Sequence, residues 1–186
     1  MPKYYGLTKI HPLKPELKEL IPKDKINLIL HPKSKGSGRE WGIENFSKLI
    51  ELLPESKYRI FVTGTNDEKQ LIISFLLKYQ NKIIDMTGKL SLTELISFIN
   101  ETDILVASGT GPLHIASALG KFTIGLFPPM RPIFPQRWQP IGINSHYLVI
   151  DKADCNDCRN TKDCHCIRSI KPEEVVEKIA NNFCRI

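Results

Sequence analysis

Residues 104–114 read Ile-Leu-Val-Ala-Ser-Gly-Thr-Gly-Pro-Leu-His. The apolar run at the start is the pattern of a buried strand, and a helical pattern follows over Leu113–Leu119. Between them, Gly109 and Gly111 allow a sharp turn and let a ligand approach the backbone closely. Pro112 suits the first turn of a helix. The stretch therefore predicts a strand, a glycine-rich turn and a helix.

This turn is a candidate anion site. A helix that begins directly after a turn leaves backbone N–H groups without partners at its positive end. Such an end binds anions, and phosphate is the usual one. Thr110 adds a hydroxyl, and His114 falls on the first turn of the predicted helix. Two interpretations remain open here, a phosphate-binding turn or a tight connection that binds nothing.

The composition is that of an ordinary soluble protein, with 186 residues, 41% of them hydrophobic and 25% charged. The 26 basic residues exceed the 20 acidic ones and give a net charge of +6. This excess fits a phosphate-rich ligand or an anionic membrane surface, and no run of like charge points to nucleic acid. The chain shows no apolar stretch of about 18 residues and no signal-peptide core, so we expect a cytoplasmic protein.

Short apolar runs alternate with helical patterns from residue 26 onward. The strands that we expect are residues 27–32, 59–64, 83–87, 103–107, 122–127 and 147–150. This alternation predicts an α/β fold, a Rossmann-like parallel sheet with helices on both faces. Residues 1–25 carry four prolines and many lysines, without an obvious core pattern, and we expect a linker or lead-in with a short helix near Glu16–Leu20.

Ligands of such sheets bind at the carboxyl ends of the strands, near the point where the strand order reverses. The loops expected there are residues 31–40, 64–68, 86–91, 108–114 and 128–140. In the first of them, Ser34, Lys35 and Arg39 supply hydroxyl and cationic groups, and an arginine can fork across two phosphate oxygens. The alternative is a solvated loop. The sequence is not a P-loop, because GxxxxGK[ST] does not occur.

Two further loops carry candidate contacts. Glu68 follows Gly64 at the end of a predicted strand, where an acid commonly accepts ribose hydroxyls. Alternatively, it stabilises the helix that opens there, for which Asn66 or Asp67 is the expected N-cap. Loop 128–140 carries cationic and aromatic side chains that either contact the donor or acceptor or stiffen a surface loop, namely Arg131, Arg137 and Trp138.

Four motifs recur in the same order in the lipopolysaccharide heptosyltransferases, glycosyltransferase family 9. They are His31-Pro32 with Arg39-Glu40-Trp41, Gly64-Thr65-Asn66-Asp67-Glu68, Thr87-Gly88-Lys89-Leu90-Ser91-Leu92, and Gly109-Thr110-Gly111-Pro112-Leu113-His114. The chain resembles this family over residues 26–186. Two departures stand out: the family often has an acid where this chain has Gly109, and a lysine where it has Arg39.

The resemblance implies one half of a GT-B glycosyltransferase, which has two Rossmann-like domains. Residues 26–186 would be the C-terminal nucleotide-sugar-binding domain, and residues 1–25 the interdomain linker. The N-terminal acceptor domain, which carries the proposed general base, would be absent. We therefore expect a fragment, a split-gene product or an expressed domain that binds a nucleotide-sugar without transferring sugar alone.

The resemblance also implies the roles of individual residues. Arg39 would stabilise the leaving diphosphate, Glu68 would hold the ribose, and Met86 would lie near the base. The full set of expected substrate-binding residues is Ser34, Lys35, Arg39, Gly64, Glu68, Met86, Thr110, Gly111, Pro112 and His114. The implied reaction is metal-independent transfer with inversion and without a required cofactor, in which the turn and Arg39 stabilise the leaving group.

The implied donor is a nucleotide-diphosphate sugar, ADP-heptose first, and the implied acceptor is the lipopolysaccharide core or a related glycan. The acceptor would be bound through the N-terminal domain, and the protein would work in the cytoplasm or peripherally at the inner membrane, without nucleic acid. The alternatives are a catalytically incomplete nucleotide-sugar-binding module, or another nucleotide-sugar transferase or an epimerase.

A separate cysteine-dense segment contains Cys155, Cys158, Cys164 and Cys166. Four cysteines within so few residues are compatible with a structural zinc site, although the Cys-x-Cys pair is unusual for tetrahedral zinc. A disulfide and reduced thiols that brace a loop are the other two interpretations, and the reducing cytoplasm favours free thiols.

Overall fold

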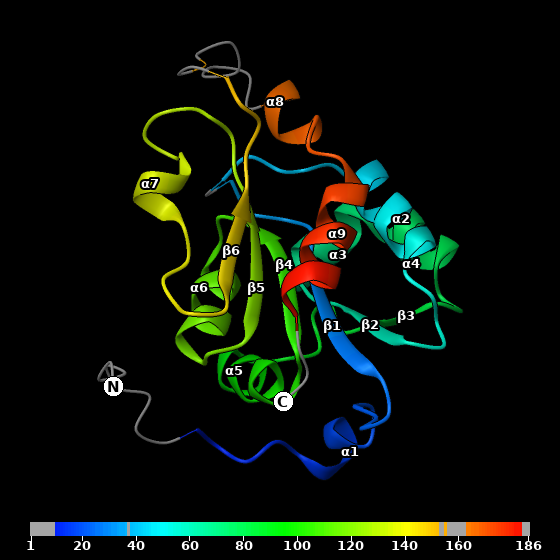
Figure 1. The fold of residues 1–186 in the computed structure, drawn as a ribbon. Helices are drawn as coiled ribbons and strands as arrows, with labels where there is room; N and C mark the ends of the chain where they lie inside the picture. The colour runs from blue at the N-terminus through cyan, green and yellow to red at the C-terminus, as the bar shows by residue number, and fades with distance from the viewer. Residues whose placement is uncertain (1–9, 37, 153–154, 156–162, 184–186) are drawn as a thin grey trace.

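The computed structural model describes residues 10–36, 38–152, 155 and 163–183. It forms a parallel sheet in the order β3-β2-β1-β4-β5-β6 (Figure 1). The strands are β1 (Ile26–His31), β2 (Tyr58–Val62), β3 (Ile83–Asp85), β4 (Ile104–Ser108), β5 (Phe122–Leu126) and β6 (Ser145–Leu148). The predicted Rossmann-like fold is confirmed, because this is the strand order of a doubly wound α/β sheet.

The helices connect successive strands and close the chain. They are α1 (Pro15–Lys18), α2 (Ile43–Leu52), α3 (Asn66–Leu71), α4 (Ile73–Lys78), α5 (Leu92–Glu101), α6 (Gly111–Ala118), α7 (Pro135–Trp138), α8 (His165–Arg168) and α9 (Pro172–Asn182). Two apolar clusters lie on opposite faces of the sheet. One packs under α2, α4 and α9, and the other under α1, α5 and α6.

The strands divide their side chains between these clusters. In β1, Leu28 and Leu30 join the first cluster and Ile29 joins the second, because successive strand residues point to opposite faces. A sheet covered on both faces buries both sets, so its strands read as continuous apolar runs. Trp41 is fully buried beside the first cluster, and its indole N–H donates to the carbonyl of Ile170 at 2.8 Å.

The N-terminal segment packs against the sheet's second cluster. Four of its apolar side chains contact that cluster, namely Leu13, Leu17, Leu20 and Ile21. The Ser97 hydroxyl donates to the carbonyl of His11 at 2.8 Å, and Lys14 pairs with Glu94 at 2.6 Å. We expected no core pattern in this segment, and for its described part that expectation was wrong. A segment that lies along α5 can pack against the core with only a few, widely spaced apolar side chains.

Helix boundaries show a second difference. The expected N-cap at Asn66 or Asp67 was wrong: α3 is capped by Thr65, whose hydroxyl accepts from the N–H of Glu68 at 3.3 Å. The Glu68 side chain in turn accepts from the N–H of Thr65, which completes a capping box. Ile72 then interrupts the predicted helix and separates α3 from α4. The capping box expected at Ser91 and Glu94 is confirmed.

The position of the functional site follows from the strand order. From β1 the chain builds the sheet outward through β2 to β3, and from β4 it builds in the other direction to β6. The connections that leave β1 and β4 therefore diverge at the carboxyl edge and leave a crevice between them. The loops after these two central strands are the ones that the sequence marked as anion-binding.

Candidate functional site

The loops after β1 and β4 meet at two glycines. A Cβ placed on Gly38 would lie 3.3 Å from the carbonyl oxygen of Gly109. The absence of a side chain at Gly38 therefore allows the two loops to approach each other closely. Two cavities lie beside these loops at the carboxyl edge of the sheet, and both include residues of the turn that begins α6.

The first cavity, called here the Glu68 cavity, has a volume of about 330 Å³. It is lined by His31, Ser34, Lys35, Thr63, Gly64, Thr65, Glu68, Met86, Leu90, Leu92, Leu95, Thr110, Gly111 and Pro112. All the expected substrate-binding residues except Arg39 and His114 line this cavity. They come from loops that follow four different strands, so the fold brings together groups that are far apart in sequence.

Glu68 combines the two roles that the sequence left open. It is only 4% exposed, and its Oε2 accepts hydrogen bonds from the N–H of Thr65 at 2.7 Å and from the Thr65 hydroxyl at 3.0 Å. The carboxylate thus caps α3 and also lines the cavity. Because both hydrogen bonds go to Oε2, Oε1 is the oxygen that remains for a ligand.

His31 lines the Glu68 cavity, although the sequence marked it only as part of a family motif and not as a ligand contact. Its Nδ1 is hydrogen-bonded to the Thr63 hydroxyl at 2.9 Å. Burial lowers the pKa of His31, and the nearby charge of Glu68 opposes this effect only in part. The imidazole is therefore neutral at pH 7. Its position as the last residue of β1 was the available signal, because strand ends point their side chains toward the crevice.

The loop after β1 is held by its own hydrogen bonds. The N–H of Ser34 donates to Oε1 of Glu40 at 3.1 Å, and the Ser34 hydroxyl donates to the carbonyl of Gly38 at 3.1 Å. Lys33 forms an ion pair with the same Glu40 carboxylate. Lys35 has a positive φ of 50° and an exposed side chain at the cavity's edge. The loop is therefore a preformed structure with one cation at its tip.

The second cavity, called here the His114 cavity, has a volume of about 240 Å³. It is lined by Gly38, Arg39, Gly109, Thr110, Gly111, His114, Leu126, Phe127, Pro128, Ile133 and Trp138. It holds the two expected residues that the first cavity lacks, Arg39 and His114. Of the side chains marked in loop 128–140, Trp138 lines it, whereas Arg131 and Arg137 do not. The two cavities share Thr110 and Gly111.

Two polar side chains at this junction are buried without a partner in the described part of the chain. They are the hydroxyl of Thr110, a residue only 4% exposed, and Nε2 of His114. Burial lowers the pKa of His114, whose ring centroid lies 6.3 Å from that of Trp138. A buried polar atom without a partner costs about 1–3 kcal/mol. The junction is therefore suited to a polar ligand that would satisfy both groups.

Phe127 explains why position 109 is a glycine. A Cβ on Gly109 would lie 2.7 Å from Cε1 of Phe127, and a Cβ on Gly125 would lie 2.4 Å from Cε2 of the same ring. Both distances are too short for a real side chain. The Phe127 ring is thus seated against two glycine backbones and forms an apolar wall of the His114 cavity. The sequence did not reveal this wall.

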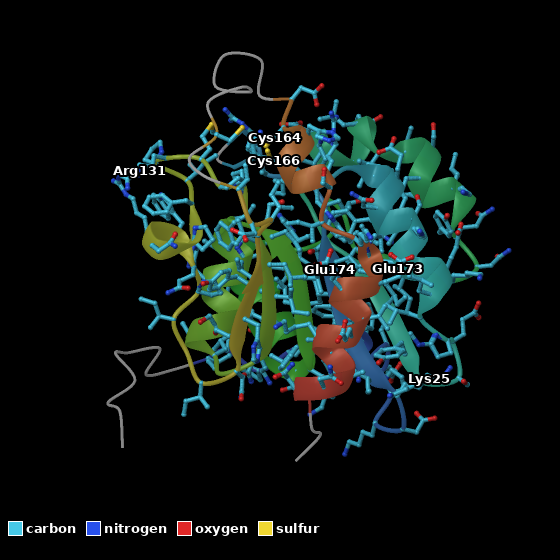
Figure 2. The ribbon with its side chains drawn as sticks, turned by 45° about the horizontal axis from the view of Figure 1, so that its top comes forward. Lys25, Arg131, Cys164, Cys166, Glu173 and Glu174 are labelled. Atoms are coloured by element: carbon cyan, nitrogen blue, oxygen red, sulfur yellow. The ribbon has the colours of Figure 1, made fainter. Side chains whose placement is uncertain are left out.

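The cysteine segment lies near α8, where Figure 2 labels Cys164 and Cys166. Cys155, Cys164 and Cys166 are buried and form no disulfide within the described residues, and the sulfurs of Cys155 and Cys166 lie 3.6 Å apart. Cys158, the fourth residue of the expected zinc set, lies outside the described residues. Within the described ranges, no group of three or more His, Cys, Asp or Glu side chains is arranged to hold a metal ion. The N–H of Cys155 donates to the carbonyl of Pro129 at 3.0 Å and so ties this segment to loop 128–140.

In the part of the chain that the structure describes, none of the helices has the length and apolar character needed to cross a bilayer.

Comparison with known proteins gives a family match. A model described as glycosyltransferase family 9 (heptosyltransferase) matches residues 7–166. The chain is 28% identical over 155 residues to lipooligosaccharide heptosyltransferase 2 of Campylobacter jejuni subsp. jejuni serotype O:6 (strain 81116 / NCTC 11828). The alignment covers 78% of this chain and 48% of that relative, so the chain spans about half the length of this curated relative.

Solved structures share the fold. The ADP-heptose lipopolysaccharide heptosyltransferase II of E. coli superposes with a TM-score of 0.69 at 16% identity, covering 90% of this chain and 51% of that one. The E. coli heptosyltransferase WaaC with ADP superposes with a TM-score of 0.66 at 17% identity, covering 88% and 46% respectively. At 16% and 17% sequence identity, these superpositions show that the fold is shared.

Proposed function

The chain belongs to glycosyltransferase family 9, and on that premise we propose that residues 26–186 form the donor-binding unit of a heptosyltransferase-like enzyme. The proposed donor is a nucleoside diphosphate sugar. One observation carries this proposal: two cavities lie beside the turn that begins α6 and share its residues Thr110 and Gly111. A nucleoside diphosphate sugar is arranged in the same way: its nucleoside and its sugar are the two ends, and the diphosphate joins them in the middle.

The Glu68 cavity would hold the nucleoside. Oε1 of Glu68 would accept the ribose hydroxyls, as acids at strand ends of such sheets commonly do. The base would lie among the apolar side chains of Met86, Leu90, Leu92 and Leu95. Adenine is the base we propose, because one similar solved structure is a heptosyltransferase with ADP and another is an ADP-heptose heptosyltransferase.

The diphosphate would lie at the turn. The Thr110 hydroxyl and the N-terminal end of α6 would provide neutral donors, and Lys35 and Arg39 would provide positive charge from the facing loop. In the transition state, charge accumulates on the departing diphosphate. Donors already in place for that charge lower the barrier, and Arg39 can contact two oxygens at once.

The transferred sugar would occupy the His114 cavity. Phe127 and Trp138 would pack against the apolar C–H faces of the sugar ring, and Nε2 of His114 would bond a hydroxyl or a phosphate oxygen. We propose a heptose as the sugar, because the matched family and the similar protein of Campylobacter jejuni are heptosyltransferases.

The proposed reaction is a single displacement with inversion. An acceptor hydroxyl attacks the anomeric carbon, the bond to the diphosphate breaks, and Arg39 with the turn stabilises the leaving group without a metal ion. None of the residues that line the His114 cavity is a carboxylate. We therefore propose that the general base, and the contacts to a glycolipid of the lipopolysaccharide core or a related glycan, come from outside residues 26–186.

The lack of a carboxylate in the lining of the His114 cavity also favours a second candidate function, a module that binds the donor without transferring its sugar.

Calorimetry with matched variants tests the proposal. The chain is titrated with ADP, UDP, GDP and ADP-heptose. We expect the adenine compounds to bind most tightly, and Arg39→Ala and Glu68→Ala each to weaken binding about tenfold or more, since each removes a charged hydrogen bond.

The control is Glu94→Ala, which removes the equivalent capping box of α5 but lies outside the cavity lining. It separates loss of a helix cap from loss of a ligand contact. Equal weak binding of all four compounds, unchanged by Arg39→Ala and Glu68→Ala, would overturn the assignment.

A further inference from the structure

Glu40 lies at the end of the loop after β1 and lines neither the Glu68 cavity nor the His114 cavity. The loop itself contributes to both, because Ser34 and Lys35 line the first and Gly38 and Arg39 line the second. Glu40 instead lines a third cavity, of about 320 Å³, which the loop shares with α2 and α8. Its carboxylate can therefore affect a donor in the first two cavities only through the loop or through its charge.

The Glu40 carboxylate contacts the beginning of the same loop through both of its oxygens. Oε1 accepts a hydrogen bond from the N–H of Ser34 at 3.1 Å, and Oε2 forms the ion pair with Lys33. The Ser34 hydroxyl donates to the carbonyl of Gly38 at 3.1 Å and also lies 3.4 Å from Oε1. Ser34 is buried, so solvent weakens these contacts little. Together they join the beginning of the loop to its end.

The tip of the loop has a backbone conformation that needs such support. The φ angles of Lys35 and Gly36 are 50° and 81°, both in the left-handed region. Glycine adopts this region readily, whereas a residue with a Cβ does so at a cost in free energy and stays there only when its surroundings hold it. The side chain of Lys35 is exposed. The contacts that Ser34 makes with Glu40 provide support directly beside this strained residue.

The end of the loop is anchored in the core. Trp41, the residue after Glu40, is fully buried and donates its indole N–H to the carbonyl of Ile170 at 2.8 Å. Glu40 therefore connects this fixed point to the beginning of the loop. Arg39 lies directly beside the connection, and Gly38 lies against the turn that begins α6. The position of the loop relative to that turn thus depends on the contacts of one carboxylate.

We propose that Glu40 is a positioning residue for donor binding, a role that rests on the proposed function. It holds Lys35 and Arg39 where the diphosphate binds, without contacting the donor itself. A loop already held in its binding conformation loses less entropy when the ligand arrives, which increases affinity. The charge of Glu40 acts in the opposite direction, because a carboxylate near a diphosphate repels it. Removing the carboxylate should therefore weaken donor binding through the loop, whereas through charge alone it would strengthen donor binding.

Two substitutions at this one position test the role. Glu40→Ala and Glu40→Gln remove the same negative charge, but the glutamine amide keeps an oxygen that can accept from the N–H of Ser34. In calorimetry we expect Glu40→Ala to weaken ADP binding about tenfold, since it removes a buried donor's charged partner. Glu40→Gln should retain most of the affinity. Adenosine lacks the diphosphate and should bind equally well to both variants and to the unchanged chain.

The matched control is Glu173→Ala on α9, labelled in Figure 2, which removes a carboxylate paired with Lys48 at 2.8 Å. Glu173 lies outside the lining of all three cavities, so ADP binding should not change. Circular dichroism verifies that every variant folds.

Three results would overturn the positioning role. They are ADP binding by Glu40→Ala that is as tight as in the unchanged chain or tighter, an equal loss in Glu40→Gln, and a loss of adenosine binding in parallel with that of ADP. An unchanged chain that does not bind ADP would remove the proposed function as well. ADP binding that is the same in the unchanged chain and in Glu40→Ala would remove the positioning role alone.

Discussion

Thr110 and Gly111 are the two residues on which the proposed site depends, because both cavities include them. Thr110 carries a buried hydroxyl without a partner among the described residues, and a Cβ on Gly111 would meet no atom within 4 Å. The sequence predicted both residues as ligand contacts. It did not predict Phe127 as a wall, because the fit of that ring against Gly109 and Gly125 depends on strand pairing between β4 and β5.

His31 provides a pH-dependent test at this scale. Burial lowers the pKa of His31 in the folded chain below its usual value near 6.5. On acidification the unfolded chain therefore binds a proton first, and the free energy of unfolding should fall as the pH drops through about 6.5. Denaturant titrations at about pH 7.5 and pH 5.5 measure this fall.

The His31→Gln variant should show a smaller fall between the two pH values. Some dependence should remain, because burial also lowers the pKa of His114 and His146. His165→Gln, at an exposed residue, serves as the control. A fall in His31→Gln as large as that in the unchanged chain would contradict the assignment of a buried neutral imidazole.

At the scale of elements, apolar periodicity located all six strands and the four helices of eight residues or more that the structure describes. The short helices α7 and α8 were missed, because four residues are too few to show a helical period. The break at Ile72 was also missed. The cap of α3 was placed one or two residues late, although Thr65 and Glu68 form a recognisable capping box.

The turn between β4 and α6 offers a matched pair of substitutions. Gly109→Ala places a methyl group 2.7 Å from the buried Phe127 ring, and should lower the free energy of unfolding by about 1–3 kcal/mol. Gly111→Ala meets open space and should leave stability unchanged or slightly higher. Its methyl group stands at the junction of the cavities, so donor binding should weaken.

Urea denaturation and calorimetry separate the two outcomes of this pair. We expect the larger loss of stability in Gly109→Ala. We expect weaker donor binding in Gly111→Ala, in a chain that remains fully folded. Equal stability of both variants would contradict the packing described for Phe127. Unchanged donor binding by Gly111→Ala would contradict the position of the diphosphate.

At the scale of the whole molecule, the parallel sheet and its ligand edge were predictable, because strand–helix alternation determines both. The two cavities that share Thr110 and Gly111 at that edge were not, since they depend on how the loops after the strands pack against one another.

A crystal structure of the chain with ADP-heptose would show whether one ligand occupies both cavities. We expect the diphosphate at Thr110 and Gly111, the adenosine in the Glu68 cavity, and the heptose in the His114 cavity between His114 and Trp138. A diphosphate bound away from this turn, or a ligand whose nucleoside and sugar occupy other surfaces, would contradict this arrangement.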